Sequence, residues 1–178
     1  MSAIHQATTG FGMKTLLVEL LYLDAETCAP CIGTEKALAR AEMILSEPLH
    51  YLGVRLDIRK IHVVDAKIAA AEKFLSSPTI RVEGIDIDPA RTEGDCPSCG
   101  ALTGDAVSIN CRNWHWRGEV FLTAPVGKIV ESVLSATLQM QAGDRGGQAE
   151  PIQQSHYTMP QNLVSFFKAR DENLKLSC

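Results

Sequence analysis

The motif CAPC at residues 28–31 constrains the fold most, because a strand-like run precedes it and a helix-forming segment follows it. Residues 14–24 form an apolar run whose one charge between its ends is Glu19, as in a mostly buried strand. Strong helix formers occupy residues 30–45, and Pro48 is expected to end that helix. The two cysteines are therefore expected at a helix N-terminus, directly after a strand.

A second strand and helix follow the first pair. Residues 51–64 alternate between apolar and charged side chains in their middle, which predicts a strand. Asp65 resembles the N-cap of a helix that ends before Pro78. Because strands joined through a helix usually pair in parallel, this order predicts an α/β domain.

The parity of the next apolar residues predicts a hairpin. In one straight strand, Val82 and Ile85 would face opposite sides of the sheet. A two-residue turn at residues 83–84 instead pairs Val82 with Ile85 and sets Arg81 opposite Asp86. The hairpin brings together the apolar side chains and the opposite charges.

The remaining chain is predicted to be an insertion, a last core helix and a tail. Residues 88–123 are read as an insertion in which a loop rich in Gly, Pro and Asp is followed by a small hairpin around Arg117-Gly118. Pro125 opens the last core helix. The expected divisions are a loose leader at 1–13, a domain at 14–141, and a linker with a short C-terminal helix at 142–178 that presents Leu163, Phe166 and Phe167.

The CAPC motif can carry thiol chemistry. The thiolate is the reactive form of cysteine, and the partial positive charge of a helix N-terminus stabilises it. We expect Cys28 to be the more exposed sulfur, which makes it the attacking thiol and Cys31 the resolving one. Asp24 and Glu26 oppose this activation, because a nearby negative charge disfavours a thiolate.

CAPC and the later Ser77-Pro78-Thr79, in this order along residues 14–140, resemble the thioredoxin and glutaredoxin superfamily. Together with CPSCG and CRNWHWRGEVFLTAP, they are similar to a prokaryotic thioredoxin-like family of uncharacterised function. The resemblance implies a thioredoxin-like β-α-β-α-β-β-α fold with a cysteine-bearing insertion before the last core helix and a C-terminal helical appendage. It also implies a cis Ser77-Pro78 bond beside the cysteines and a substrate groove formed by Thr27, Pro30, Ser77, Pro78 and Thr79.

A second cysteine pair raises the alternative of a metal site. Cys96 and Cys99 have the spacing of a zinc knuckle, and Cys111 is a third sulfur. A fourth ligand would have to be His115, a water or a CAPC thiol, although His115 is better read as a sheet surface residue. Because the hairpin returns the chain toward CAPC, both pairs could converge on zinc or on a softer ion such as Hg(II) or As(III).

Three functions follow from these patterns. The first is thiol-disulfide exchange by Cys28 and Cys31 with a disulfide-bearing protein or a small thiol, which requires no cofactor. The second is non-catalytic binding of zinc, mercury or arsenic by the two CxxC pairs. The third is a redox-inert interaction module whose thiols are structural, since buried cysteines are common.

The composition indicates which classes of partner the protein is not expected to bind. Lys and Arg total 17 against 21 Asp and Glu, so the chain lacks the broad positive surface that binds nucleic acid. Residues 16–23 are too short for a membrane span, which predicts a cytoplasmic protein without a membrane partner. A second copy of the chain is a candidate partner for the C-terminal helix.

Overall fold

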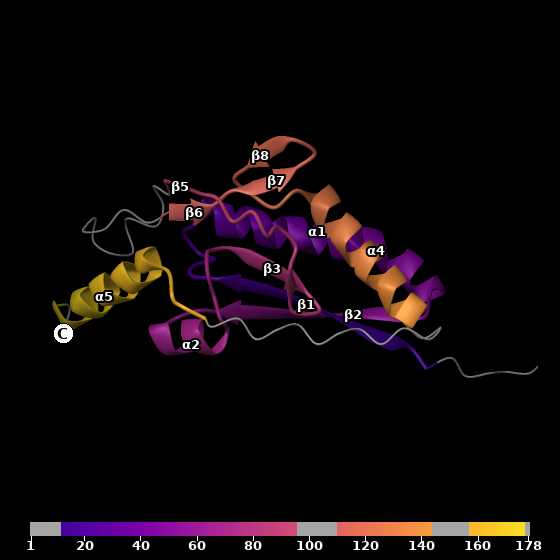
Figure 1. The fold of residues 1–178 in the computed structure, drawn as a ribbon, viewed down its shortest axis with the longest axis horizontal. Helices are drawn as coiled ribbons and strands as arrows, with labels where there is room; N and C mark the ends of the chain where they lie inside the picture. Colours follow the sequence, from indigo (N-terminus) through magenta and orange to yellow (C-terminus); the bar gives the residue numbers. More distant parts are fainter. Residues whose placement is uncertain (1–11, 96–109, 144–156, 177–178) are drawn as a thin grey trace, which may run out of the picture.

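The computed structural model describes residues 12–95, 110–143 and 157–176. Its centre is a mixed four-stranded sheet in the order β2-β1-β3-β4. The strands are β1 (Lys14–Tyr22), β2 (Val54–His62), β3 (Thr79–Val82) and β4 (Ile85–Asp86). Figure 1 shows α1 (Ala29–Tyr51) and α4 (Val126–Gly143) on one side of the sheet and α2 (Ala66–Ala71) on the other, with α5 (Gln161–Leu176) beside α2. The chain is thus an α/β protein.

The predicted strand pairing is confirmed. β1 and β2 are parallel, and β3 and β4 form the predicted hairpin with Val82 opposite Ile85 and Arg81 opposite Asp86. Glu83 and Gly84 have φ angles of 51° and 76°, the left-handed values that a tight two-residue hairpin turn requires. β1 also pairs antiparallel with β3, so the strand before CAPC lies in the middle of the sheet.

The first helix is longer than predicted. Pro48 was expected to stop it, but α1 continues to Tyr51 with Pro48 in its last turn. Proline removes one backbone donor from a helix, and packing can offset that loss. Leu45 and Leu49 on either side of Pro48 are both buried in the core, so the last turn is held by its apolar side chains.

The second helix is shorter than predicted. The segment before Pro78 was expected to be helical throughout, but α2 ends at Ala71. Lys73 has a φ angle of 47°, a left-handed conformation that ends many helices, and the Phe74 amide donates to the Ala69 carbonyl at 2.8 Å. This turn carries the Phe74 side chain into the core, where it is wholly buried. The predicted N-cap is confirmed, since Asp65 accepts a hydrogen bond from the Ile68 amide at 2.7 Å.

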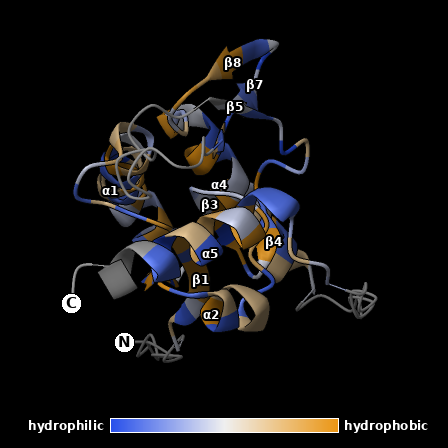
Figure 2. Cartoon of the chain, turned by 90° about the vertical axis from the view of Figure 1, so that its left-hand side faces the viewer, coloured by the Kyte–Doolittle hydropathy of each residue, from blue (hydrophilic) through white to orange (hydrophobic). Residues whose placement is uncertain are grey.

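Two apolar clusters hold the fold together. The larger lies between the sheet and helices α1 and α4, and it includes Leu16 and Leu20 of β1 and Ile129 and Val133 of α4. The smaller lies at the end of β1 and β2, where α2 and α5 meet the start of α1. In Figure 2, α5 crosses in front of this end of the sheet. The cysteine motif therefore lies in the second cluster.

The insertion forms two small sheets. The hairpin predicted around Arg117-Gly118 is confirmed, with β7 (Trp114–Trp116) antiparallel to β8 (Glu119–Phe121). A second pairing was not predicted: β5 (Glu93–Asp95) lies antiparallel to β6 (Asn110–Arg112). The pairing of β5 with β6 holds both ends of the intervening segment together at the start of α1 (Figure 1).

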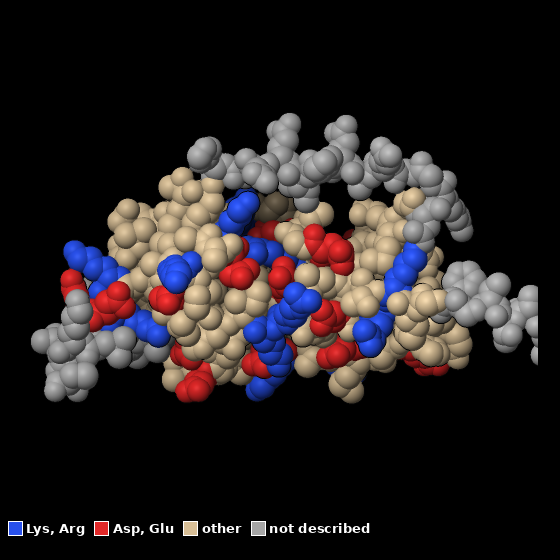
Figure 3. Space-filling view, turned by 90° about the horizontal axis from the view of Figure 1, so that it is seen from below, with Lys and Arg blue, Asp and Glu red and all other residues tan. Residues whose placement is uncertain are grey.

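Charged side chains of both signs are mixed over the face in Figure 3, where lysines and arginines alternate with aspartates and glutamates. Among the helices that the structure describes, none has the length and apolar character needed to cross a membrane.

Candidate functional site

The CAPC motif lies at the start of α1, as predicted. Cys28 is the N-cap residue, and the helix opens with Pro30 in its first turn. The preceding loop folds around Asp24, which accepts hydrogen bonds from the Glu26 amide at 2.7 Å and from the amide and hydroxyl of Thr27. Burial would raise the pKa of the Asp24 carboxyl, but these hydrogen bonds outweigh burial and hold the pKa below its usual value. A carboxylate thus fixes the loop that presents Cys28.

Both cysteines of the motif are thiols and both are buried. Cys28 is 0% exposed and Cys31 is 1% exposed, so the expectation that Cys28 is the more exposed sulfur is wrong. The neighbouring Cys28 sulfur and burial raise the pKa of the Cys31 thiol far above its ordinary value, while a hydrogen bond with Ser77 partly opposes the rise. Cys31 is therefore protonated in this conformation, as a resolving thiol would be before exchange begins.

The Ser77-Pro78 loop lies against the cysteines. The predicted cis bond is present between Ser77 and Pro78. The Ser77 hydroxyl lies 3.5 Å from the Cys31 sulfur and accepts a hydrogen bond from the Leu23 amide at 3.0 Å. This hydroxyl therefore connects the end of β1 to the cysteine pair.

The residues expected to form a substrate groove do not share one exposed surface. Thr27 is exposed and Pro30 is half-buried, whereas Ser77, Pro78 and Thr79 are buried. Strand β6 of the insertion lies against the Ser77-Pro78-Thr79 segment, since the Arg112 amide donates to the Ser77 carbonyl at 2.8 Å. A protein segment already occupies the backbone position beside Pro78.

Cys111 of the insertion lies directly beside the motif. Its sulfur is 4.0 Å from the Cys28 sulfur, and its side chain is 3% exposed. Cys111 is disulfide-bonded, and its partner lies outside the described residues. Cys96 and Cys99, which were expected near CAPC, lie outside the described residues. Among the described residues, Cys111 and Arg112 place the insertion beside CAPC.

Arg112 is a site residue that the sequence reasoning missed. Its guanidinium is wholly buried and donates to both carboxylate oxygens of Asp86, at 2.9 and 2.8 Å. It also donates to the Thr79 hydroxyl at 3.0 Å and lies 4.6 Å from the ring centre of Trp114. These contacts anchor β6, and with it Cys111, to the core.

Helix α5 seals the cysteine cluster. Leu163, Phe166 and Phe167 are buried in the same apolar cluster as Cys28, Cys31 and Cys111, which confirms the stripe expected on this helix. Asn162 at its start donates to the Glu93 carboxylate of β5 at 2.7 Å. Burial raises the pKa of Glu93 above its usual value, although this hydrogen bond opposes the rise. The tail and the insertion thus close over the thiols together.

A pocket of about 390 Å³ lies beside the same loop. It is lined by Asp24 and Glu26 on one side, His62 at the end of β2, and Phe166 and Arg170 of α5. Phe166 lines this pocket and also belongs to the apolar cluster that holds the thiols.

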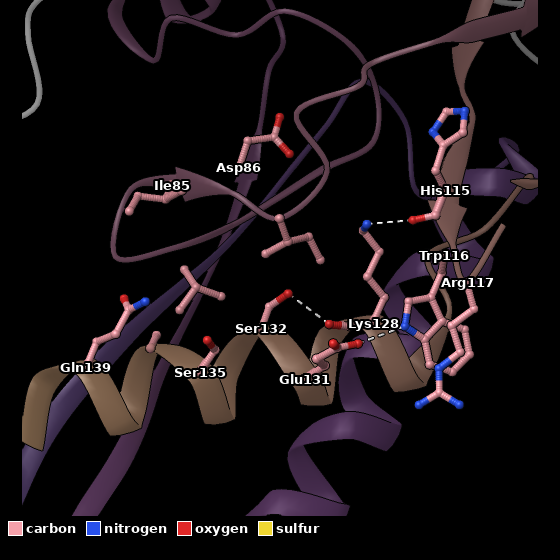
Figure 4. Close-up of a pocket in the computed structure, with 13 residues that line it drawn as sticks. Ile85, Asp86, His115, Trp116, Arg117, Lys128, Glu131, Ser132, Ser135 and Gln139 are labelled. Atoms are coloured by element: carbon pink, nitrogen blue, oxygen red, sulfur yellow. Dashed lines mark hydrogen bonds between the residues drawn. The ribbon is translucent and has the colours of Figure 1, made fainter. Parts of the chain in front are cut away.

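A pocket of about 520 Å³ lies elsewhere, between β4, β7 and α4 (Figure 4). Lys128 points from α4 to the His115 carbonyl, which accepts its hydrogen bond at 2.6 Å, and Glu131 accepts one from the Trp116 indole at 3.0 Å. No cysteine lines this pocket. His115 is half-buried and contacts Asp88 and Thr92, so within the described residues it is a surface residue of β7 and does not join the sulfurs.

No metal-binding group is visible in residues 12–95, 110–143 and 157–176, where no three His, Cys, Asp or Glu side chains are arranged around one point. Cys28, Cys31 and Cys111 share one apolar cluster, but the Cys111 sulfur is part of a disulfide. Cysteine binds zinc as the thiolate, and a sulfur held in a disulfide is not available as a ligand.

Comparison with protein families shows which family the chain resembles. Residues 16–133 match the family described as Domain of unknown function (DUF2703), while no curated protein and no solved structure matches the chain. The matched segment runs from β1 into α4 and includes Cys28, Cys31, Cys111 and Arg112, whereas α5 lies after it. Because the match spans well over half of the sequence, the chain belongs to the DUF2703 family.

Proposed function

We propose that the protein is a thioredoxin-like thiol-disulfide oxidoreductase in which Cys28 and Cys31 form the redox pair. The observation that carries this proposal is the placement of two adjacent thiols at the start of α1, with Cys31 in contact with Ser77. The β-α-β-α-β-β order of the core, followed by α4 after the insertion, supports the thioredoxin-like assignment.

The environments of the two sulfurs support different roles. Cys28 is at the N-cap, where the backbone amides of the first turn favour a thiolate, and its sulfur faces a disulfide sulfur. Cys31 lies one turn further along and its pKa is raised by Cys28 and by burial. Cys28 is therefore the attacking thiol and Cys31 the resolving one, on grounds of position and pKa instead of exposure.

In the proposed reaction, the Cys28 thiolate attacks one sulfur of a substrate disulfide and expels the other as a thiolate. Cys31 then loses its proton, attacks the Cys28 sulfur and releases the second substrate thiol. The substrate disulfide gains two electrons, and Cys28 and Cys31 lose two as they form their own disulfide.

A redox titration of the full chain tests this function. Wild-type protein is equilibrated with glutathione buffers of stepped potential, acid-quenched, alkylated and mapped by mass spectrometry. We expect a reversible Cys28–Cys31 disulfide while circular dichroism keeps its native shape, and Cys28→Ser should abolish it. Failure of these two cysteines to pair at every potential would overturn the oxidoreductase proposal.

A second candidate function is thiol-based binding of a soft ion. The contact of Cys111 with Cys28 favours it, because reduction of the Cys111 disulfide would add a third thiol to the cluster that holds Cys28 and Cys31. Three sulfurs suit As(III) or Hg(II), and a fourth ligand would complete a zinc site. Metal analysis of anaerobically reduced protein, with and without added Zn(II) or As(III), tests it: an unchanged thiol count and no bound ion would exclude this function.

A further inference from the structure

The only sulfur outside the motif that reaches Cys28, within the described residues, belongs to a disulfide. Cys28 and Cys111 lie 4.0 Å apart, close to the contact distance of two sulfur atoms, and both side chains are buried. The attacking atom of thiol-disulfide exchange must reach a disulfide sulfur directly. A thiol and a disulfide sulfur are therefore already next to one another without any external substrate.

This contact is held by hydrogen bonds and ion pairs on both sides of Cys111. The next residue, Arg112, is fixed by its amide on the Ser77 carbonyl and by its guanidinium on Asp86. The previous residue, Asn110, pairs with Asp95 in the β5–β6 ladder. Three independent attachments thus set the position of the Cys111 sulfur relative to α1.

The same arrangement keeps other disulfides away from the pair. Cys28 and Cys31 are covered by the apolar side chains of α5, with Phe166 at 0% exposure and Phe167 at 4%. A protein substrate could reach Cys28 only after α5 or β6 had moved. Among the described residues, Cys111 is the disulfide-bonded cysteine whose sulfur contacts the buried pair.

We propose that the Cys111 disulfide is the direct redox partner of the Cys28–Cys31 pair, so that the insertion relays electrons between the buried thiols and the outside. This inference rests on the proposed function. The Cys28 thiolate attacks the Cys111 sulfur, the existing Cys111 disulfide breaks, and its former partner leaves as a thiolate that takes up a proton. Cys31 then loses its proton, attacks Cys28 and releases the Cys111 thiol. Two electrons pass from the motif to the insertion, and no further reactant is consumed.

The partner outside the molecule follows from this relay. The insertion ends the intramolecular transfer with a dithiol, Cys111 and the cysteine that it leaves. A dithiol donates its electrons to a disulfide substrate. In the relay, the disulfide that Cys28 attacks is the Cys111 disulfide, and the external substrate class is a disulfide that the resulting dithiol reduces.

A trapping experiment on the full chain tests the relay. The Cys31→Ser variant stops after the first step, because no thiol remains to resolve the mixed disulfide. Native variant protein is incubated with N-ethylmaleimide, which alkylates the thiol released from Cys111 and pulls the exchange forward. Mass mapping without reductant should then find Cys28 linked to Cys111. The Cys28→Ser variant is the matched control and should keep the original Cys111 disulfide. Cys31→Ala repeats the test with a second variant.

The relay is overturned if Cys28 becomes alkylated and no Cys28–Cys111 disulfide forms in the folded Cys31→Ser and Cys31→Ala variants.

A third variant, Cys111→Ser, separates a failure of the relay from a failure of the proposed function. If the relay is real, glutathione should oxidise the Cys28–Cys31 pair in Cys111→Ser at least about tenfold more slowly than in wild type, since the intramolecular route is lost. Equal rates would also overturn the relay while leaving the oxidoreductase function intact. A wild-type pair that never oxidises overturns the function itself.

Discussion

The buried guanidinium of Arg112 donates to both carboxylate oxygens of Asp86, at 2.9 and 2.8 Å. The pair connects β6 of the insertion to β4 at the edge of the central sheet. Paired donors in this fork geometry fix orientation as well as distance. The position of Cys111, one residue before Arg112, therefore depends on a charge in the core sheet.

Removal of Asp86 should be strongly destabilising, because it leaves Arg112 charged and buried. We expect Asp86→Ala to lower the free energy of unfolding by about 3 kcal/mol, the lower end of the range for breaking a buried pair. The lower end applies because the Asp86 side chain is 23% exposed, so water partly replaces the lost partner. Urea denaturation monitored by circular dichroism measures the loss.

An exposed ion pair is the matched control. Lys60 and Glu35 lie 2.6 Å apart, but their side chains are 50% and 34% exposed. Glu35→Ala should therefore change the free energy of unfolding by less than about 1 kcal/mol. Equal losses in the two variants would show that the Arg112 pair has no special role in anchoring the insertion.

The apolar stripe of α5 should control access to the thiols. Phe166→Ala removes a fully buried ring from the cluster that holds Cys28 and Cys31, and we expect it to cost about 3–5 kcal/mol of stability. Alkylation of both thiols in the native state should become faster, because the cover over them opens. Timed iodoacetamide labelling with mass mapping measures the two rates.

Two substitutions separate local opening from general loss of stability. Val164→Ala changes a side chain of the same helix that is 41% exposed, and labelling should stay at the wild-type rate. Val133→Ala weakens the other cluster, between the sheet and α4, and should destabilise the protein without a selective effect on Cys28. If Phe166→Ala labels no faster than Val133→Ala, α5 is not the cover.

Local patterns in the sequence predicted the elements near CAPC. The parity of Val82 and Ile85 located the hairpin, because a strand alternates faces with a period of two. The cysteine motif between a strand and a helix former predicted the start of α1, and the spacing of Phe166 and Phe167 predicted a buried helix face. Each of these predictions depends on residues within one or two elements.

The closure of the site could not be predicted in the same way. Cys28 is buried by Cys111 and by α5, which lie 83 and more residues further along the chain. No sequence pattern indicated that Arg112 is buried, because an arginine in a polar segment is usually exposed. Its partner Asp86 is 26 residues away, beyond the reach of any local pattern. Exposure of a thiol at a helix start is thus decided by distant segments, which no local pattern reveals.

Gly33 should tolerate no side chain, because the segment before α4 approaches it closely. A Cβ atom at this position would lie 2.4 Å from Cγ2 of Thr123, and the next residue, Thr34, accepts a hydrogen bond from the Ala124 amide at 3.1 Å. We expect Gly33→Ala to lower the free energy of unfolding by about 1–3 kcal/mol, as overpacking does in other cores. Thermal or urea unfolding would measure this loss.

A second substitution should rescue this variant. Thr123→Ser removes the Cγ2 atom that meets the new methyl group, so the double variant should recover most of the lost stability. Gly143→Ala is the control, because no atom of the described residues lies within 4 Å of a Cβ atom there and no destabilisation is expected. Additive losses in the double variant would mean that Thr123 is not the obstacle.

The stability of the protein should fall at alkaline pH because of Cys31. Its pKa in the folded protein is raised above the ordinary value of 9.0 by the Cys28 sulfur and by burial. The unfolded chain loses this proton as the pH rises through 9.0, whereas the folded chain keeps it. The contribution of Cys31 is therefore complete below pH 9.0 and declines above it, by at most about 1.4 kcal/mol per pH unit. Urea unfolding without oxygen, on either side of pH 9.0, measures this decline.

The control is Cys31→Ser, which retains the other groups that titrate in this range. Its free energy of unfolding should decline less steeply with pH than that of the wild type. Parallel pH profiles for the two proteins would mean that the Cys31 thiol ionises in the folded state as easily as in the unfolded chain.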